Sequence, residues 1–122
     1  MMRIATMLCH FHKFHAIVTG ESIGQVASQT IINMGVINDA TDMLMIRPLA
    51  GMDKLESIDR AMKLGTYEIS IEPQPDSCTV FAPPSPAVAA KYNLVEEEEK
   101  KIPGMAEALE RAFQSIEKFE NL

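Results

Sequence analysis

The sequence predicts an α/β fold in which a short, mostly parallel sheet is flanked by helices. Two short apolar runs typical of strands, residues 16–19 and 44–49, alternate with segments of helical periodicity. This alternation favours a parallel sheet, because parallel strands need a crossover connection, usually a helix. With 122 residues and 47% hydrophobic residues, the chain is long and apolar enough for one domain with a small core.

The first helix is predicted over residues 1–14, where apolar side chains recur at helical spacing. The strand at 16–19 follows, and then a turn. Residues 25–32 predict a second helix that ends at Gly35, since glycine is favoured just beyond a helix C-terminus.

The turn between this strand and this helix is a candidate anion site. Gly20 and Gly24 allow a sharp turn and a close approach, and N–H groups at the start of a helix attract anions. Ser22, Gln25 and Gln29 recur at helical spacing and predict a polar stripe on one helix face. A simple connection whose amides bond only to backbone fits the same spacing, so spacing does not decide between the two.

The run 44–49 predicts a buried strand. Asp53 and Glu56 then predict a capping box at the start of a helix, and Gly65 predicts its end. The predicted inner face of that helix consists of Leu55, Ile58, Ala61 and Met62.

Prolines mark the boundaries of the predicted segments in the last third of the chain. Five prolines between residues 69 and 86 predict an extended segment without regular structure, and the charged run 96–101 predicts a solvated helix face. Pro103 and Gly104 break the chain before an amphipathic helix over 105–119. Its apolar stripe either covers this domain or meets a partner.

Composition points to a cytoplasmic protein without a membrane segment. No apolar run approaches the length of a membrane span, and the N-terminus lacks the layout of a signal peptide. Cys9 and Cys78 lie far apart in unlike contexts, which does not indicate a disulfide framework. The formal charge of −6 offers no basic surface for RNA phosphates.

Four segments, in this order, resemble the tRNA 4-thiouridine synthetases, the ThiI family: TGESIGQVASQT at 19–30, RPLAGMDK at 47–54, LGTYEIS at 64–70 and DSCTVFAP at 76–83. Members of this family are PP-loop ATP pyrophosphatases that adenylate a tRNA uridine and replace its oxygen with sulfur. The resemblance covers roughly residues 1–99.

The resemblance implies that residues 1–101 form the C-terminal half of a PP-loop (adenine nucleotide alpha hydrolase-like) domain. The amphipathic pattern predicts that residues 102–122 form a helix packed on this domain or on a partner. The PP-loop itself, Ser-Gly-Gly-x-Asp-Ser, occurs nowhere in the sequence. The implied cofactor is ATP with Mg²⁺. The implied partners are a second copy or a complementing chain that carries the PP-loop and RNA-binding region, tRNA bound only through that chain, and a protein that donates sulfur.

Cys78 is the strongest candidate for sulfur transfer. Thiolate is the nucleophile wherever sulfur passes through a persulfide, and a loop bounded by prolines would leave the thiol accessible. An inert buried cysteine is the alternative from the residue alone. The resemblance places Cys78 on the sulfur-transfer cysteine of a segment that many members write DCCTVF, although Ser77 here replaces the first cysteine of that pair.

Lys54 is the second catalytic candidate. A lysine near the leaving pyrophosphate would neutralise charge that develops during adenylation, whereas a solvated surface lysine is the simpler interpretation. The resemblance places Lys54 on the family's catalytic lysine, and places Gly20 and Gln29 on positions that contact the nucleotide. Gly20 would let backbone lie against the adenosine, and the Gln29 amide could both donate and accept hydrogen bonds.

Cys9, His12 and His15 are spaced so that they could share one helix face, but the resemblance implies no metal there and we predict none. Two functions fit the sequence. One is a subunit or fragment of a tRNA sulfurtransferase related to the thiamine biosynthesis ThiI proteins, active only if a partner supplies the missing PP-loop. The other is a non-catalytic, self-associating remnant domain that at most binds nucleotide or carries sulfur.

Overall fold

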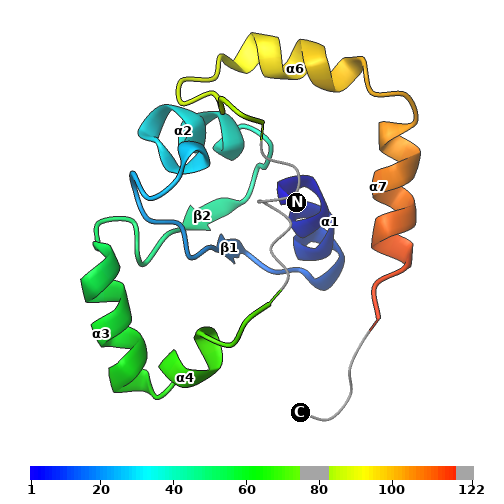
Figure 1. The fold of residues 1–122 in the computed structure, drawn as a ribbon. Helices are drawn as coiled ribbons and strands as arrows, with labels where there is room; N and C mark the ends of the chain where they lie inside the picture. Colours follow the sequence, from blue (N-terminus) through cyan, green and yellow to red (C-terminus); the bar gives the residue numbers. More distant parts are fainter. Residues whose placement is uncertain (75–82, 118–122) are drawn as a thin grey trace.

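The computed structural model describes residues 1–74 and 83–117 (Figure 1). Two strands form a parallel sheet in which Ala16 lies opposite Leu44 and Val18 lies opposite Ile46. This confirms the predicted α/β class. The elements in chain order are α1 (Met2–His12), β1 (Ala16–Val18), the 3₁₀ turn η1 (Ala27–Gln29), α2 (Ile31–Asn38), β2 (Leu44–Ile46), α3 (Lys54–Leu64), α4 (Tyr67–Ser70), α6 (Tyr92–Lys100) and α7 (Met105–Gln114).

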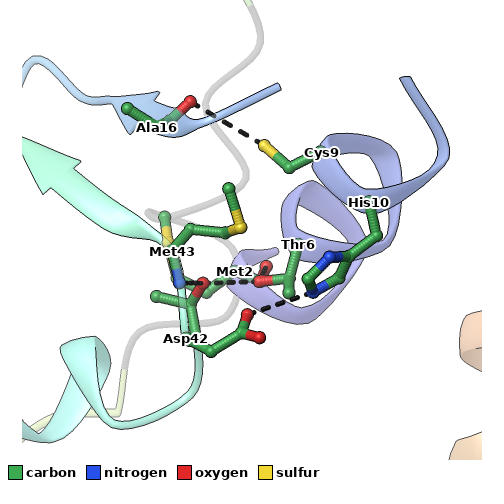
Figure 2. A network of polar contacts seen from close by, with 8 residues as sticks. Met2, Thr6, Cys9, His10, Ala16, Asp42 and Met43 are labelled. Carbon is green, nitrogen blue, oxygen red and sulfur yellow. Dashed lines mark hydrogen bonds and ion pairs between the residues drawn. The ribbon is translucent and has the colours of Figure 1, made fainter. Parts of the chain in front are cut away.

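Helix α1 is fastened to the sheet by polar contacts (Figure 2). The hydroxyl of Thr6 donates to the hydroxyl of Thr41, just before β2, over 2.6 Å. The thiol of Cys9, a buried residue, points at the carbonyl oxygen of Ala16 in β1 over 3.8 Å. The predicted first helix is therefore confirmed, and it lies against the N-terminal end of the sheet.

The sheet is covered on one face only. Alternate residues of a strand point to the same face, so Val18, Leu44 and Ile46 share one face and Ile17 lies on the other. Ile17 is buried, whereas Val18 and Leu44 are each 65% exposed and Ile46 is 43% exposed. The expectation of a buried strand at 44–49 is therefore wrong for this face, because no element within 1–74 or 83–117 covers it.

The second helix differs from the prediction. Residues 25–32 do not form one helix, because Thr30 has an extended backbone (ψ 151°) and interrupts it. The Thr30 hydroxyl oxygen instead accepts the N–H of Asn33 over 3.1 Å and caps α2, as threonine favours at a helix start. Gly35 does not end the helix, since α2 continues to Asn38.

Asn33 fastens the segment before α6 to α2. Its side chain is buried, and its amide nitrogen donates to the carbonyl oxygens of Ala27 (2.6 Å) and Ala87 (2.7 Å). Its amide oxygen accepts the N–H of Ala90 over 2.8 Å. A buried amide whose donors and acceptor are all paired holds its partners firmly, because separating them would leave buried polar groups without partners.

Helix α3 begins and ends as predicted. Asp53 and Glu56 form a reciprocal capping box, with bonds of 2.9 and 2.8 Å, and Gly65 adopts a left-handed conformation (φ 72°) that ends the helix. The predicted inner face is wrong in part, because Leu55 is 74% and Met62 55% exposed. Among the described elements, α3 packs mainly against the short helix α4, which is too small to cover that face.

The C-terminal helices wrap back onto α1. The acidic run lies in the exposed helix α6, as predicted, and its Glu99 pairs with Arg3 of α1. Helix α7 lies beside α1 (Figure 1), with the Phe113 ring edge-on to Phe11 at 5.7 Å between centroids. The stripe of α7 thus contacts its own chain, while the division into 1–101 and 102–122 stays a prediction. None of the helices in the described ranges is long and apolar enough to cross a membrane.

Candidate functional site

The candidate site lies where β1 and β2 end. Because the two strands are parallel, the chain leaves both at the same edge of the sheet, which is where ligands bind in open α/β sheets. The first loop begins with Gly20. The second leads through residues 47–53 to Lys54, the first residue of α3. The fold therefore brings the turns that carry two of the predicted site residues to one edge.

Hydrogen bonds join these two loops directly. The hydroxyl of Ser22, which is 8% exposed, donates to the carbonyl oxygen of Met52 over 2.6 Å. The N–H of Ile23 donates to the carbonyl oxygen of Ala50 over 3.1 Å. The predicted polar stripe is therefore wrong: Ser22 faces the second loop, two residues before Lys54, and does not share a helix face with the glutamines.

An ion pair joins the same loops. Arg47 Nε lies 2.7 Å from Glu21 Oε2, and the two side chains are 16% and 17% exposed. The hydroxyl of Thr19 donates to the same carboxylate oxygen over 2.8 Å, and Arg47 Nη1 donates to Asn38 Oδ1 over 3.3 Å. Neither Glu21 nor Arg47 was singled out from the sequence. The sequence did contain a signal for them. Glu21 and Arg47 each come at the end of a predicted strand, and parallel strands end at the same edge of a sheet.

The surroundings of Glu21 lower the pKa of its carboxyl group below the ordinary value of 4.5. Burial raises this pKa, but hydrogen bonds from Arg47 and Thr19 and the positive charge of Arg47 outweigh burial. Glu21 is therefore ionised at neutral pH.

This lowered pKa predicts that Glu21 stabilises the fold only above acid pH. A carboxyl whose pKa is lower in the folded state contributes stability above its unfolded pKa and loses it as the pH falls through the folded pKa. At pH 7, we expect Glu21→Gln to lower the free energy of unfolding by on the order of 2 kcal/mol. In urea titrations the difference from wild type should shrink below pH 4.5. A difference independent of pH would contradict the ion pair.

Gln29 borders an open pocket of about 540 Å³, a size typical of small-molecule sites. Its Oε1 atom is buried and finds no hydrogen-bond donor within the described residues. A buried acceptor without a donor is costly, so a ligand N–H group at this point would stabilise the site. Most of the lining is apolar, and the polar residues at the walls are Thr19, Glu21, Ser28, Gln29 and Glu99.

The other predicted residues are placed less closely together. Gly20 is exposed, and no atom lies within 4 Å of the place a Cβ would take, so the backbone there is open to a ligand. Lys54 is exposed and lines a second open pocket, of about 470 Å³, together with residues of α3 and α4. Lys54 does not line the pocket that Gln29 borders, and Gln29 does not line that of Lys54. Cys78 lies outside the described residues, so the roles of all four stay predictions.

The described part of the chain offers no metal site. Within it, no three His, Cys, Asp or Glu side chains gather closely enough to hold an ion. Cys9 is directed at a backbone carbonyl, and the ring of His12 stacks on that of Phe14.

Comparison with known proteins gives consistent matches. The family model of the thiamine biosynthesis protein (ThiI) matches residues 1–103. A probable tRNA sulfurtransferase of Caldanaerobacter subterraneus subsp. tengcongensis is 50% identical over 102 residues, which are 84% of this chain and 27% of that protein. The corresponding protein of Geobacillus kaustophilus is 45% identical over 117 residues, 96% of this chain and 29% of that protein.

A solved structure matches as well. The crystal structure of a 4-thiouridine synthetase–RNA complex with bound ATP superposes with a TM-score of 0.85 and 44% sequence identity, covering 93% of this chain and 29% of that one. The chain thus spans less than a third of the relatives it matches. Because the family model covers most of its length, the chain belongs to the ThiI family.

Proposed function

We propose that this chain forms the adenine side of the nucleotide pocket in a tRNA sulfurtransferase that makes 4-thiouridine. The observation that carries the proposal is that Gln29, whose buried Oε1 lacks a donor within the described residues, borders a pocket lined also by Thr19 and Glu21 at the end of β1. The 6-amino group of adenine is a donor that would pair with it. The similarity to a 4-thiouridine synthetase with bound ATP supports this assignment.

In this proposal each predicted residue has a distinct task. The open backbone at Gly20 lies against the nucleotide, and Lys54 neutralises negative charge as uridine is adenylated and pyrophosphate leaves. The thiol of Cys78 then takes part in delivering sulfur from a persulfide of the donor protein. The outer sulfur bonds to the uridine carbon as AMP departs with the activated oxygen, and a disulfide formed between Cys78 and the donor's cysteine supplies the two electrons. Lys54 borders a different pocket, which has no lining residue in common with the Gln29 pocket, so in this proposal the lysine acts on phosphate and not on adenine.

The exposed sheet face supports a completing partner. Parallel sheets are normally buried on both faces, yet Val18, Leu44 and Ile46 are exposed here. We infer that the remainder of a PP-loop domain, in the same polypeptide or in a second chain, covers this face and carries the phosphate loop. Because the formal charge is −6, the basic surface for tRNA would also belong to that remainder.

The same exposed face favours one other function. Two copies of the chain could bury it against each other, as in a self-associating domain that binds nucleotide or carries sulfur without catalysis. The two functions differ in whether the chain becomes active when the missing part is supplied.

A complementation experiment separates them. The Caldanaerobacter relative, shortened so that it lacks the segment matching this chain, would be mixed with or fused to this protein, together with tRNA, ATP and a sulfur donor. We expect 4-thiouridine to form, and we expect Gln29→Ala to raise the KM for ATP about tenfold, the effect of one lost hydrogen bond to a buried group. Gln25→Ala, at an exposed glutamine in the same segment, is the matched control. Thiolation in neither arrangement, with no binding of AMP, would favour the remnant domain.

A further inference from the structure

We propose that Glu21 and Arg47 are positioning residues, which hold the loop that leads to Lys54 at a set place relative to the turn at Gly20. This inference rests on the proposed function, because it assigns Lys54 the role of acting on phosphate. Glu21 borders the pocket assigned to adenine, but the proposal gives neither residue a direct part in the chemistry. Four observations carry it.

The ion pair spans the gap between the two loops and is largely shielded from solvent. Both side chains are more than four-fifths buried, and the pair joins residues 26 positions apart. The guanidinium of Arg47 also reaches Asn38 at the end of α2, and the carboxylate of Glu21 also accepts from Thr19. The pair therefore ties together the ends of both strands and of the crossover helix.

The far end of the second loop is tied as well. The chain turns twice between Arg47 and Met52, with backbone bonds from Ala50 N–H to Arg47 O and from Met52 N–H to Leu49 O. The hydroxyl of Ser22 then holds the carbonyl of Met52. The loop is thus fixed at its start by Arg47 and at its end by Ser22.

Lys54 comes almost directly after this fixed loop in the sequence. The capping box of Asp53 sets the first turn of α3 directly after the fixed end of the loop, so the place of Lys54 depends on that end. Lys54 itself is exposed, and no hydrogen bond of its ammonium group to a described residue is found. Its position therefore comes from the backbone that carries it.

The chemistry of the pair fits positioning better than packing. Burying two charges costs desolvation energy, and apolar residues of similar size often stabilise a fold as well or better. An ion pair with directed hydrogen bonds, in contrast, accepts one geometry and rejects others. A pair placed between two loops of a site thus restricts their relative movement.

A double-mutant cycle with Lys54 tests the inference in the complemented enzyme. We expect Glu21→Gln to lower kcat for pyrophosphate release about tenfold in the wild-type background and less than about twofold in the Lys54→Ala background, because its effect passes through the lysine. Glu96→Gln, the same change in the exposed pair of Glu96 and Lys100, should leave kcat unaltered in both backgrounds. An equal loss from Glu21→Gln in both backgrounds would refute positioning of Lys54.

Hydrogen exchange of the chain by itself gives a readout that does not need activity. We expect Glu21→Gln to speed exchange of the Ile23 amide, which bonds to Ala50, about tenfold relative to the Met34 amide, which bonds to Thr30 within α2. Ser22→Ala, a milder change that removes only the bond to Met52, should act in the same direction. Equal acceleration at Ile23 and Met34 would mean a general loss of stability and would overturn the inference. Failure of the proposed function would appear differently, as unaltered pyrophosphate release in Lys54→Ala alone.

Discussion

Replacing Cys78 with alanine is expected to abolish 4-thiouridine formation in the complemented enzyme while adenylation continues. A thiolate is required to carry or release sulfur, and alanine has no atom that can form a bond to sulfur in its place. The expected loss of thiolation is at least about 1,000-fold, as for other nucleophile deletions. The measurement is 4-thiouridine content of the tRNA by absorbance or mass spectrometry, with pyrophosphate release followed in parallel.

Cys9, the other cysteine of the chain, is the matched control. Cys9 is buried in α1 against β1, so Cys9→Ala should lower the free energy of unfolding by about 1 kcal/mol and leave sulfur transfer intact. Cys78→Ser tests whether the oxygen analogue of the thiol suffices, and we expect it to be inactive. If Cys78→Ala unfolds under conditions where wild type is folded, Cys78 is a core residue and not the sulfur carrier.

Replacing Lys54 with alanine is expected to lower the rate of pyrophosphate release about 100-fold and to change the affinity for AMP less than about twofold. A cation that neutralises charge in the transition state contributes about 3 kcal/mol there, but little to binding of a nucleotide that lacks the leaving phosphates. Single-turnover release of pyrophosphate measures the first quantity, and titration with AMP measures the second.

Lys63→Ala serves as the control for Lys54. Lys63 lies on the same helix, where it pairs with Asp59 in an exposed i,i+4 pair at 2.5 Å. Such pairs contribute little stability, so this variant should match wild type in both measurements. Undiminished pyrophosphate release in Lys54→Ala would remove the lysine from the mechanism. An equal loss in both lysine variants would point to the overall charge of α3 instead.

Signals that act over a few residues were sufficient to predict several elements. The capping box of Asp53 and Glu56 and the left-handed Gly65 bound α3 as predicted, because a cap and a C-terminal glycine act within one helical turn. The same kind of signal was misread once. Gly35 is a favoured residue just after a helix, but Thr30 caps α2 five residues earlier and the helix runs through the glycine. The prediction failed because Thr30 and Gly35 implied different bounds for the helix, and the threonine cap was the signal that the structure follows.

Burial was the least predictable property. Leu44, Ile46 and Leu55 have the apolar character of core residues, yet all are exposed in the described structure. An apolar pattern shows that a face needs a partner, but it does not show whether the partner belongs to the same chain. The exposure of these residues supports the proposed completion of the domain by a further segment.

The residues of the candidate site also fall into two groups, those predicted from the sequence and those visible only in the structure. Gly20, Gln29, Lys54 and Cys78 were found from the sequence because they stand in segments that resemble one family, and the chain belongs to that family. Glu21 and Arg47 were not, because an ion pair across 26 positions depends on the parallel pairing of two strands. The burial of the Gln29 oxygen without a donor likewise depends on the tertiary packing around that residue.

The sequence by itself determined the α/β class, the start and end of α3, and which residues are candidates for the chemistry, because these depend on neighbours in the chain or on a recognisable order of motifs. Only the tertiary structure decided that the turn at Gly20 and the loop before Lys54 are tied by Ser22 and a buried ion pair. It also decided which sheet face is left uncovered. The physical reason is that hydrogen bonds and burial between distant residues exist only when the strands are paired, and no residue's own preference specifies its distant partner.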